Sequence, residues 1–411
     1  MNKFKEFGLS ENLLKIIEKL GIKVPTKIQV QTIPHIIKGK DVIGESETGS
    51  GKTLAFGCGI VEQVEKGQGL QALVLTPTRE LAEQVKQSLI SISEHKSLKV
   101  ISVYGGVSID PQIRDLMNSE VVVATPGRFL DHYQRRTINM SKVKILVLDE
   151  ADRMLDMGFM DDVERIIQSC PKKRQTMFFS ATILPIIIRL SKKYMVDPIK
   201  VSAGRYVDPS KLKQVYYDVS KNLKLSLLIH LLRHDKSGLC MVFCNTKSTV
   251  DFVAKNLVAN EVEAVAIHGG FTQNKRSKTM EQFNKNKYHV LVCTDVAARG
   301  LHIDNVSHVY NYEVPRDPTD YVHRIGRTAR AGLNGKVVNL LCNLDFDNFN
   351  KVLRDNSSFN VDKVDLPEMG KILPVASSKT PRRGNFKPGG RRPDGRGFHG
   401  RSQNRRPRGR F

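Results

Sequence analysis

Two adjacent carboxylates, Asp149 and Glu150, follow an apolar run at 144–148 that is typical of a fully buried strand. Ligands of open α/β sheets bind at the carboxyl ends of the strands, where these two side chains would lie. A Mg²⁺ ion bound largely through water needs one carboxylate, and activation of an attacking water needs a second one beside it. The pair therefore predicts chemistry on a metal-bound phosphate, with Asp149 on the metal and Glu150 as the base.

A phosphate-binding loop is indicated by Gly51, Lys52 and Thr53, which lie between a strand-like run at 41–45 and an apolar helix start. In such a loop backbone N–H groups point at phosphate oxygens, the lysine reaches the β and γ phosphates, and the threonine hydroxyl ligates Mg²⁺. The usual pattern begins with glycine where this chain has Ser46, so the flanking strand and helix and the downstream carboxylates support the assignment. The positions expected to contact nucleotide are Thr48, Gly49, Ser50, Gly51, Lys52 and Thr53.

An amide upstream of this loop, Gln29, could recognise the base. It follows a helix predicted over 9–20, which begins after a Ser10 cap and ends at Gly21. An amide pairs bidentately with N6 and N7 of adenine. Taken alone, Gln29 is better explained as a helix-surface glutamine, and only the phosphate loop that follows favours the adenine role.

Strand-like apolar runs alternate with helical patterns along the whole chain, which predicts mostly parallel sheets wrapped by helices. The runs of the first half are 70–76, 99–104, 120–125, 144–149 and 175–180, after the one at 41–45. Those of the second half are 214–219, 239–244, 262–267, 289–294, 306–311 and 336–341. The pattern loosens over 204–211, where we place a linker. The two halves are therefore similar in architecture, but only the first has a phosphate loop.

Polar or glycine-containing groups follow nearly every strand of the first half and would line one edge of its sheet. They are Pro77, Thr78 and Arg79; Gly105 and Gly106; Thr125 and Arg128; and Ser180 and Thr182. Each group in isolation is an ordinary loop or helix cap.

The second half adds Arg327 and Arg330, three residues apart and neighbours on one helix face. Guanidinium groups from a facing domain can stabilise charge on a transferring phosphoryl group, although a surface charge run is the alternative.

The composition limits the class of protein. A length of 411 residues suggests two or three domains, at roughly 150 residues per domain. No apolar run approaches the ~18 residues of a membrane span, and the start lacks the apolar segment of a signal peptide. Six cysteines without a Cys-x-x-Cys pair argue against zinc and for reduced thiols in the cytoplasm.

The net charge of +23 requires an anionic partner, and half of it lies at the carboxyl end. From residue 371 onward there are 13 Lys and Arg against one acid, Asp394. Residues 381–411 are rich in Arg, Gly and Pro with three spaced phenylalanines, a composition that predicts disorder. Arginines would neutralise phosphates while Phe and Arg faces stack on exposed bases, so we expect a tether for nucleic acid. A merely solubilising tail is the alternative.

These motifs, in this order, resemble those of the DEAD-box RNA helicases of helicase superfamily 2, and the resemblance runs from Phe4 to about Leu341. Asp149-Glu150-Ala151-Asp152 is the motif that names that family. The resemblance implies two tandem RecA-like domains, each a mostly parallel sheet flanked by helices. Their expected limits are 1–206 and 211–357, with a basic, mostly disordered tail over 358–411.

The resemblance also implies roles for single residues. Gln29 would read adenine with Phe4 packed near the base, while Ile22 stands where the family usually has an aromatic. The implied RNA contacts are Pro77, Thr78, Arg79, Gly105, Gly106, Thr125 and Arg128 in the first domain, and 243–246, Gln273, Arg276 and Thr294 in the second. The implied coupling and nucleotide positions are Ser180, Thr182, Asp295, Gly300 and His323, with Lys52, Asp149, Glu150, Arg327 and Arg330 catalytic. His302 replaces an Asp that bonds the ribose in the family, so that charge is lost.

The resulting expectation is an ATP-dependent RNA helicase that uses ATP and Mg²⁺, binds RNA across two lobes, and unwinds short duplexes or remodels RNA–protein complexes. Its expected place is the cytoplasm, away from membranes, on ribosomal precursors or within an RNA-decay complex. Two alternatives remain open. One is an ATP-gated RNA clamp that turns over too rarely to remodel anything, and the other is a DNA-directed superfamily 2 motor.

Overall fold

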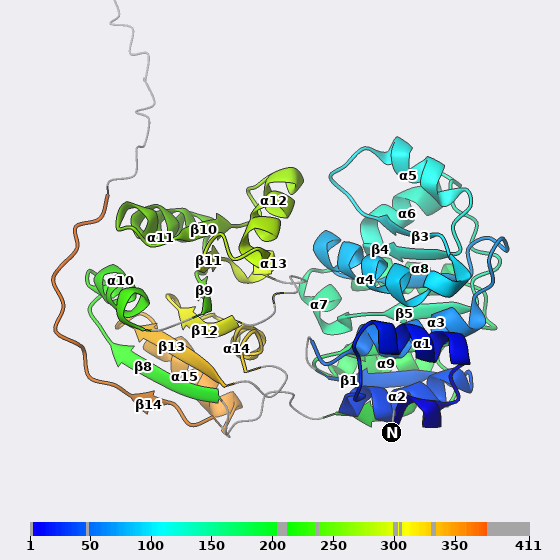
Figure 1. The fold of residues 1–411 in the computed structure, drawn as a ribbon, viewed down its shortest axis with the longest axis horizontal. Coiled ribbons are helices and arrows are strands. Elements are labelled where there is room, and N and C mark those ends of the chain that lie inside the picture. Colours follow the sequence, from blue (N-terminus) through cyan, green and yellow to red (C-terminus); the bar gives the residue numbers. More distant parts are fainter. Residues whose placement is uncertain are drawn as a thin grey trace, which may run out of the picture. The chain divides into compact units, whose positions relative to one another are not determined.

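Two parallel sheets organise the protein into two lobes (Figure 1). The computed structural model describes residues 3–46, 49–203, 212–235, 238–298, 303, 306–329, 334–357 and 359–375. Each lobe contains one sheet of seven strands, flanked by helices. The predicted α/β fold with two parallel sheets is therefore confirmed, whereas the predicted linker at 204–211 and tail at 381–411 lie outside the described residues.

The first lobe has the strand order β3-β4-β2-β5-β6-β1-β7, and the neighbouring strands are parallel. Its strands are β1 (Val42–Glu45), β2 (Ala72–Leu75), β3 (Val100–Val103), β4 (Val121–Ala124), β5 (Ile145–Leu148), β6 (Gln175–Ser180) and β7 (Ile199–Ser202). Its helices are η1 (Lys3–Phe7), α1 (Glu11–Lys19), α2 (Lys27–Ile37), α3 (Lys52–Gln63), α4 (Arg79–Ile92), η2 (Glu94–Lys96), α5 (Ile109–Leu116), α6 (Pro126–Gln134), α7 (Ala151–Asp156), α8 (Met160–Ser169) and α9 (Pro185–Tyr194).

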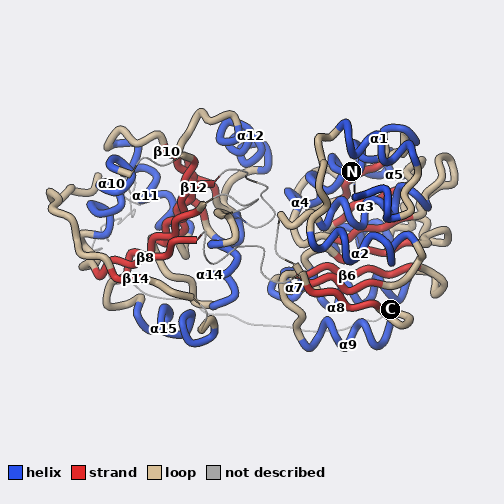
Figure 2. Tube along the Cα trace, turned by 60° about the horizontal axis from the view of Figure 1, so that its bottom comes forward, coloured by secondary structure: helices blue, strands red, loops and turns tan. Residues whose placement is uncertain are grey.

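Both faces of this sheet are buried, which explains why its central strands are continuous apolar runs. In β5, for example, Ile145 and Val147 face the core under α1 to α4, whereas Leu146 and Leu148 face the core under α5 to α9. Figure 2 shows the strands lying between the helices. Since ligands bind where such strands end, the sheet fixes one edge as the place for chemistry.

The second lobe repeats the design with the strand order β10-β11-β9-β12-β13-β8-β14, again with parallel neighbours. Its strands are β8 (Leu212–Asp218), β9 (Leu239–Phe243), β10 (Ala264–Ile267), β11 (Val290–Cys293), β12 (Val306–Asn311), β13 (Gly335–Leu341) and β14 (Asp362–Lys363). Its helices are α10 (Lys224–His234), α11 (Lys247–Ala259), α12 (Gln273–Asn284), α13 (Asp295–Ala298), α14 (Pro318–Ile325) and α15 (Phe346–Asp355). Helices α10 and α11 cover one face of the sheet, and α12 to α15 cover the other.

After α15 the chain stays on the second lobe up to Val375. The two residues of β14 pair with β8 at the sheet edge, and the following segment packs on the core beneath α10 and α11. Two buried side chains hold its backbone: Ser226 Oγ accepts from Ile372 N–H at 3.0 Å, and Asn256 Oδ1 accepts from Val375 N–H at 2.7 Å. The basic tail thus follows a segment that belongs to the second lobe.

All six cysteines are free and buried. Burial raises the pKa of the Cys58 thiol to about 12, and the pKa of Cys170 to about 11. Since the thiolate is the reactive form, these thiols are core side chains rather than nucleophiles. In the described part of the chain, no helix has both the length and the apolar character to cross a membrane.

Candidate nucleotide and RNA site

Strand β5 brings Asp149 and Glu150 to the middle of the first sheet, because it pairs with β2 on one side and β6 on the other. The two residues are only 2% and 5% exposed. Asp149 N–H donates to the Leu75 carbonyl at 2.9 Å and so continues the ladder to β2. Glu150 adopts the left-handed region with φ 53° and ψ 52°, which is rare for a residue with a side chain. This turn ends the strand and holds two buried carboxylates at the sheet edge.

The phosphate loop lies between β1 and α3. Gly49 and Gly51 have φ values of +85° and +91°, which side chains would disfavour. Lys52 is 6% exposed, and its Nζ donates to the Ser46 carbonyl at 2.8 Å. The Ser46 hydroxyl, at the position of the missing glycine, accepts from Ser50 Oγ at 2.8 Å. The loop therefore holds its lysine ammonium at the sheet edge, beside the buried carboxylates.

The electrostatics of the carboxylate pair suit a cation. The pKa of Asp149 is raised to about 7, chiefly by burial; the charges of Glu150 and Asp152 also raise it, while the Lys52 ammonium and the Glu150 N–H lower it. A buried carboxyl group with two acidic neighbours is costly to ionise unless a cation lies nearby. A divalent cation would supply that charge and favour the ionised form.

One cavity of about 680 Å³ collects the predicted nucleotide residues. Its lining includes Gln29, Gly49, Gly51, Lys52, Thr53, Asp149 and Glu150, together with Leu20, Ile22 and one side of α4. The hydroxyl of Thr53 and the carboxylate of Asp149 are hard oxygen donors, the kind that Mg²⁺ prefers. Phe4 is fully buried and packs edge to face on Phe7, with ring centroids 5.6 Å apart. It therefore lies in the core behind this region.

The Gln29 amide is fixed at both ends. Its Nε2 donates to the Gly51 carbonyl at 3.0 Å, and its Oε1 accepts from Thr26 N–H at 2.9 Å. A Cβ at Gly51 would overlap Nε2, so glycine is required there. An amide has two N–H donors and two acceptor lone pairs, so one of each remains. These match N7 and N6 of adenine, and the amide would be oriented in advance by the phosphate loop.

Replacing Gln29 by alanine should therefore reduce the preference for ATP over GTP about tenfold or more, the cost of losing a bidentate base contact. The ratio of kcat/KM for ATP to that for GTP, in RNA-stimulated hydrolysis, measures this. The exposed Gln68 replaced by alanine serves as the control. An equal loss for both nucleotides would contradict base reading and leave Gln29 as a support of the loop.

Asp152 connects the carboxylate motif to the end of β6. Its Oδ2 accepts from the Thr182 N–H at 2.9 Å and from Thr182 Oγ1 at 3.0 Å. Its own N–H donates to Ser180 Oγ at 3.1 Å. No role is predicted for Asp152 from the sequence, although its place beside two assigned carboxylates is a signal. The predicted coupling residues Ser180 and Thr182 are thus bonded to α7, the helix that starts after the predicted catalytic pair.

The predicted RNA contacts of the first lobe gather at the ends of three adjacent strands, β2, β4 and β3. The Arg79 guanidinium lies against Gly106, since a Cβ there would overlap it. Arg128 Nη2 donates to the Val107 carbonyl at 3.1 Å. Thr78 caps α4 by accepting from Leu81 N–H at 3.2 Å. The remaining predicted positions Pro77, Gly105 and Thr125 lie in the same turns. The topology thus places seven predicted contacts along one edge.

Arg324 is a buried arginine for which the sequence predicts no role. It joins several segments of the second lobe through hydrogen bonds. It is 1% exposed and pairs bidentately with Asp295, at 2.6 Å and 2.7 Å. It also donates to Asn311 Oδ1 at 2.9 Å, to the Glu313 carbonyl at 2.6 Å and to Asn245 Oδ1 at 2.9 Å. Asp295, predicted as a coupling residue, is therefore held by an arginine next to the predicted His323.

Two arginines make ion pairs between residues of different lobes. Arg276 Nη2 lies 3.0 Å from Glu80 and also donates to the Ala297 carbonyl at 3.4 Å. Arg153 Nη1 lies 2.9 Å from Asp320 Oδ1. Thr294 is 8% exposed, and its backbone carbonyl accepts from the Ala297 and Ala298 N–H groups of α13, at 3.1 Å and 2.9 Å. Gln273 is the first residue of α12.

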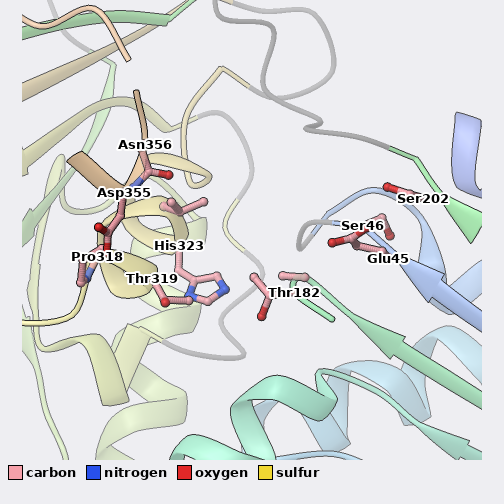
Figure 3. A pocket seen from close by; sticks show the side chains of 11 residues that line it. Glu45, Ser46, Thr182, Ser202, Pro318, Thr319, His323, Asp355 and Asn356 are labelled. Carbon is pink, nitrogen blue, oxygen red and sulfur yellow. The ribbon is translucent and has the colours of Figure 1, made fainter. Parts of the chain in front are cut away.

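The predicted residues His323 and Thr182 line one cavity, together with Glu45 and Ser46 (Figure 3). Among the residues that the structure describes, the buried Nδ1 of His323 has no hydrogen-bond partner. Arg327 is 4% exposed, after the end of α14. The predicted positions Thr48, Gly300 and Arg330 lie outside the described residues, as do His302 and the side chain of Gln273.

Sequence comparisons agree with this site. Residues 26–187 match the family model described as DEAD/DEAH box helicase, and residues 223–332 match the helicase conserved C-terminal domain. The chain is 46% identical to the ATP-dependent RNA helicase CshA of Limosilactobacillus reuteri over 336 residues, which are 81% of this chain and 68% of that one. It is 45% identical to the DEAD-box ATP-dependent RNA helicase CshA of Bacillus subtilis (strain 168) over 342 residues, 82% and 69% of the two chains.

Solved structures give the same result. Dbp5 of S. cerevisiae bound to RNA and ADP BeF3 matches with a TM-score of 0.82 at 29% identity, covering 89% of this chain and 96% of that one. A DEAD box protein from the hyperthermophile Methanococcus jannaschii matches with a TM-score of 0.55 at 39% identity, covering 88% and 98%. The chain therefore belongs to the DEAD-box family of ATP-dependent RNA helicases.

Proposed function

We propose that this protein is an RNA-dependent ATPase that binds RNA across its two lobes and locally unwinds short duplexes or remodels RNA–protein complexes. One observation supports this most strongly: Lys52, Thr53, Asp149 and Glu150 line a single cavity at the ends of parallel strands. Membership of the DEAD-box family supports the same activity. A purely structural RNA-binding protein would have no use for a buried acid pair facing a phosphate loop.

In the hydrolysis step, Lys52 neutralises the β and γ phosphates, and Glu150 accepts a proton from the attacking water. Thr53 and Asp149 would hold Mg²⁺, which when bound neutralises charge that develops on the phosphate oxygens. Arg327 and Arg330 would place positive charge against the transferring phosphoryl group. Gln29 selects adenine, and its hydrogen bond to the Gly51 carbonyl fixes the phosphate loop relative to the base.

On the RNA side, the edge formed by Arg79, Gly106 and Arg128 presents guanidinium groups and backbone N–H groups, which suit phosphates. Gln273, Arg276 and Thr294 would contact the same strand from the second lobe. Contacts to phosphates and 2′-hydroxyls give little sequence preference and distinguish RNA from DNA.

Coupling follows from shared contacts. If ATP and RNA each bind both lobes, each raises the affinity for the other by the same factor. Within the first lobe, the hydrogen bonds that join Asp152 to Thr182 and Ser180 would carry a change at the Asp149–Glu150 pair to the end of β6. In the second lobe, Asp295 and His323 would have the same coupling role. A strand bent between closed lobes leaves its duplex, and phosphate release resets the open state.

The finer assignments belong to the same proposal. The proposed domain limits are 1–206 and 211–357, with the packed segment 359–375 added to the second domain ahead of the basic tail. The site of action is the cytoplasm, and the RNA is a ribosomal precursor or a substrate of an RNA-decay complex. The bacterial relatives and the basic charge of the chain support these assignments.

Strand displacement tests the proposal. A short labelled RNA duplex with a single-stranded overhang should be separated by the protein with ATP and Mg²⁺, and not with ADP. Lys52→Ala should abolish the separation. ATP-dependent RNA binding without any strand release would contradict unwinding and favour the ATP-gated clamp.

The tail gives a separate prediction. Deleting residues 377–411 should weaken RNA affinity and flatten its dependence on salt, since it removes arginines that neutralise phosphates. ATP hydrolysis without RNA should stay unchanged. RNA affinity measured over a series of salt concentrations checks this, and an unchanged slope would contradict the tether.

A further inference from the structure

The turn 104–107, which joins β3 to α5, contains the glycines proposed to meet RNA. Gly106 has a φ of +78°, and the Arg79 guanidinium packs against it. A short turn of this kind, with two glycines, has little side-chain packing of its own to fix its shape. Its geometry must therefore come from neighbouring groups.

One buried side chain, Gln112 on α5, supplies most of that support. It is 7% exposed. Its Oε1 accepts from Tyr104 N–H at 3.1 Å, and its Nε2 donates to the Tyr104 carbonyl at 3.2 Å. Nε2 also donates to the Ser108 carbonyl at 3.2 Å. The amide thus pairs with both peptide groups of Tyr104, much as a neighbouring strand would, and also holds the far side of the turn.

The Tyr104 side chain is fixed independently. Its hydroxyl donates to Glu83 Oε1 at 2.9 Å, and Ser102 Oγ donates to the same oxygen. Lys86 pairs with the other Glu83 oxygen at 2.7 Å. Burial and the neighbouring Glu83 raise the pKa of Tyr104 to about 12, so the phenol keeps its proton and remains a donor.

The other end of the turn is held by the Arg128 bond to the Val107 carbonyl. The turn is therefore bonded at Tyr104, Val107 and Ser108, while Gly105 and Gly106 between them have no side chains of their own and the Arg79 guanidinium lies against Gly106. Such an arrangement presents backbone N–H groups at a fixed spacing, which suits a phosphate oxygen.

We propose that Gln112 is a positioning residue for RNA: it holds the 105–106 turn in the shape that accepts the RNA backbone, without touching RNA itself. This rests on the proposed function, because it assumes that RNA binds at this edge. The role is expected to concern RNA rather than ATP, since Gln112 and Tyr104 do not line the nucleotide cavity, although Glu83, which bonds the Tyr104 hydroxyl, does.

The test compares Gln112→Met, which keeps the length of the side chain and removes every hydrogen bond, with Gln112→Glu, which keeps the acceptor for Tyr104 N–H and loses both donated bonds. Gln134→Met, at an exposed position on α6, is the control. Binding of a labelled single-stranded RNA is measured with a non-hydrolysable ATP analogue present. The RNA concentration for half-maximal ATPase, kcat, and ATP affinity without RNA are measured in parallel.

Gln112→Met should raise the Kd for RNA and the half-maximal RNA concentration on the order of tenfold, as expected for a lost buried hydrogen-bond set. Gln112→Glu should weaken RNA binding at least as much, since its buried carboxylate would face the Tyr104 and Ser108 carbonyl oxygens. The kcat at saturating RNA and the ATP affinity should remain within about twofold of the unmodified values.

Unchanged RNA binding by Gln112→Met, in a protein whose unmodified form binds RNA, would overturn the positioning role alone. A parallel loss of ATP affinity would also overturn it, since that marks a general loss of structure. Absence of RNA binding by the unmodified protein would instead overturn the proposed function, and the positioning role with it.

Discussion

Replacing Glu150 by glutamine should lower RNA-stimulated ATP turnover by about 10²- to 10⁴-fold, the usual contribution of a positioned general base. The substitution keeps the shape of the side chain and the hydrogen-bonding capacity of one oxygen. It removes the charge that would accept the proton of water. Steady-state phosphate release at saturating RNA and ATP measures the effect.

The same variant separates chemistry from binding. Lys52, Thr53 and Asp149 remain, so ATP should still bind, and ATP-dependent RNA affinity should stay within a few-fold of that of the unmodified protein. The exposed Glu94 on the first lobe, replaced by glutamine, is the matched control and should hydrolyse ATP normally. A Glu150→Gln protein that retained a tenth or more of its turnover would exclude Glu150 as the base.

Replacing Arg324 by methionine should destabilise the second lobe by about 3–5 kcal/mol, the cost of leaving a buried ion-pair partner uncompensated. Arg324 is 1% exposed and makes five hydrogen bonds, two of them to Asp295. Methionine fills similar volume but satisfies none of the acceptors. Urea unfolding followed by circular dichroism measures the change, since the chain contains no Trp for fluorescence.

The exposed Arg354 provides the control for this prediction. Its side chain is 75% exposed and lies 3.6 Å from Asp355, so Arg354→Met should shift the transition by less than about 0.5 kcal/mol. An Arg324→Met protein that unfolded at the same urea concentration as the unmodified chain would contradict the structural role of Arg324.

Much of the fold could be predicted because its strands are buried on both faces. The run predicted at 144–149 contains β5, and the run at 70–76 contains β2, each with side chains packed into two cores. The edge strand β7 escaped prediction because its residues alternate between half-buried and exposed. The two-residue β14 is polar and exposed, and it exists through pairing with β8 alone.

The site residues also fall into two groups: those that a local sequence pattern identifies and those whose partners lie far away in the sequence. Lys52 and Asp149 could be assigned because the phosphate loop and the strand end have local patterns. The roles of Asp152 and Arg324 depend on partners distant in sequence, such as Thr182 for the first and Asn245 for the second. Spacing along the chain does not reveal such contacts, although each residue adjoins one that was assigned. Gln112 is a third case, since its partner Tyr104 has no motif of its own.

We propose that the protein is an ATPase that responds to RNA through its two lobes. The most direct test is steady-state ATP hydrolysis with Mg²⁺ by the intact chain, in the absence of nucleic acid, with single-stranded RNA, and with DNA of the same sequence. We expect RNA to stimulate ATP hydrolysis strongly and DNA to stimulate it little. Equal stimulation by DNA would contradict the RNA-specific assignment, and no stimulation by either would contradict the coupling of ATP to nucleic acid.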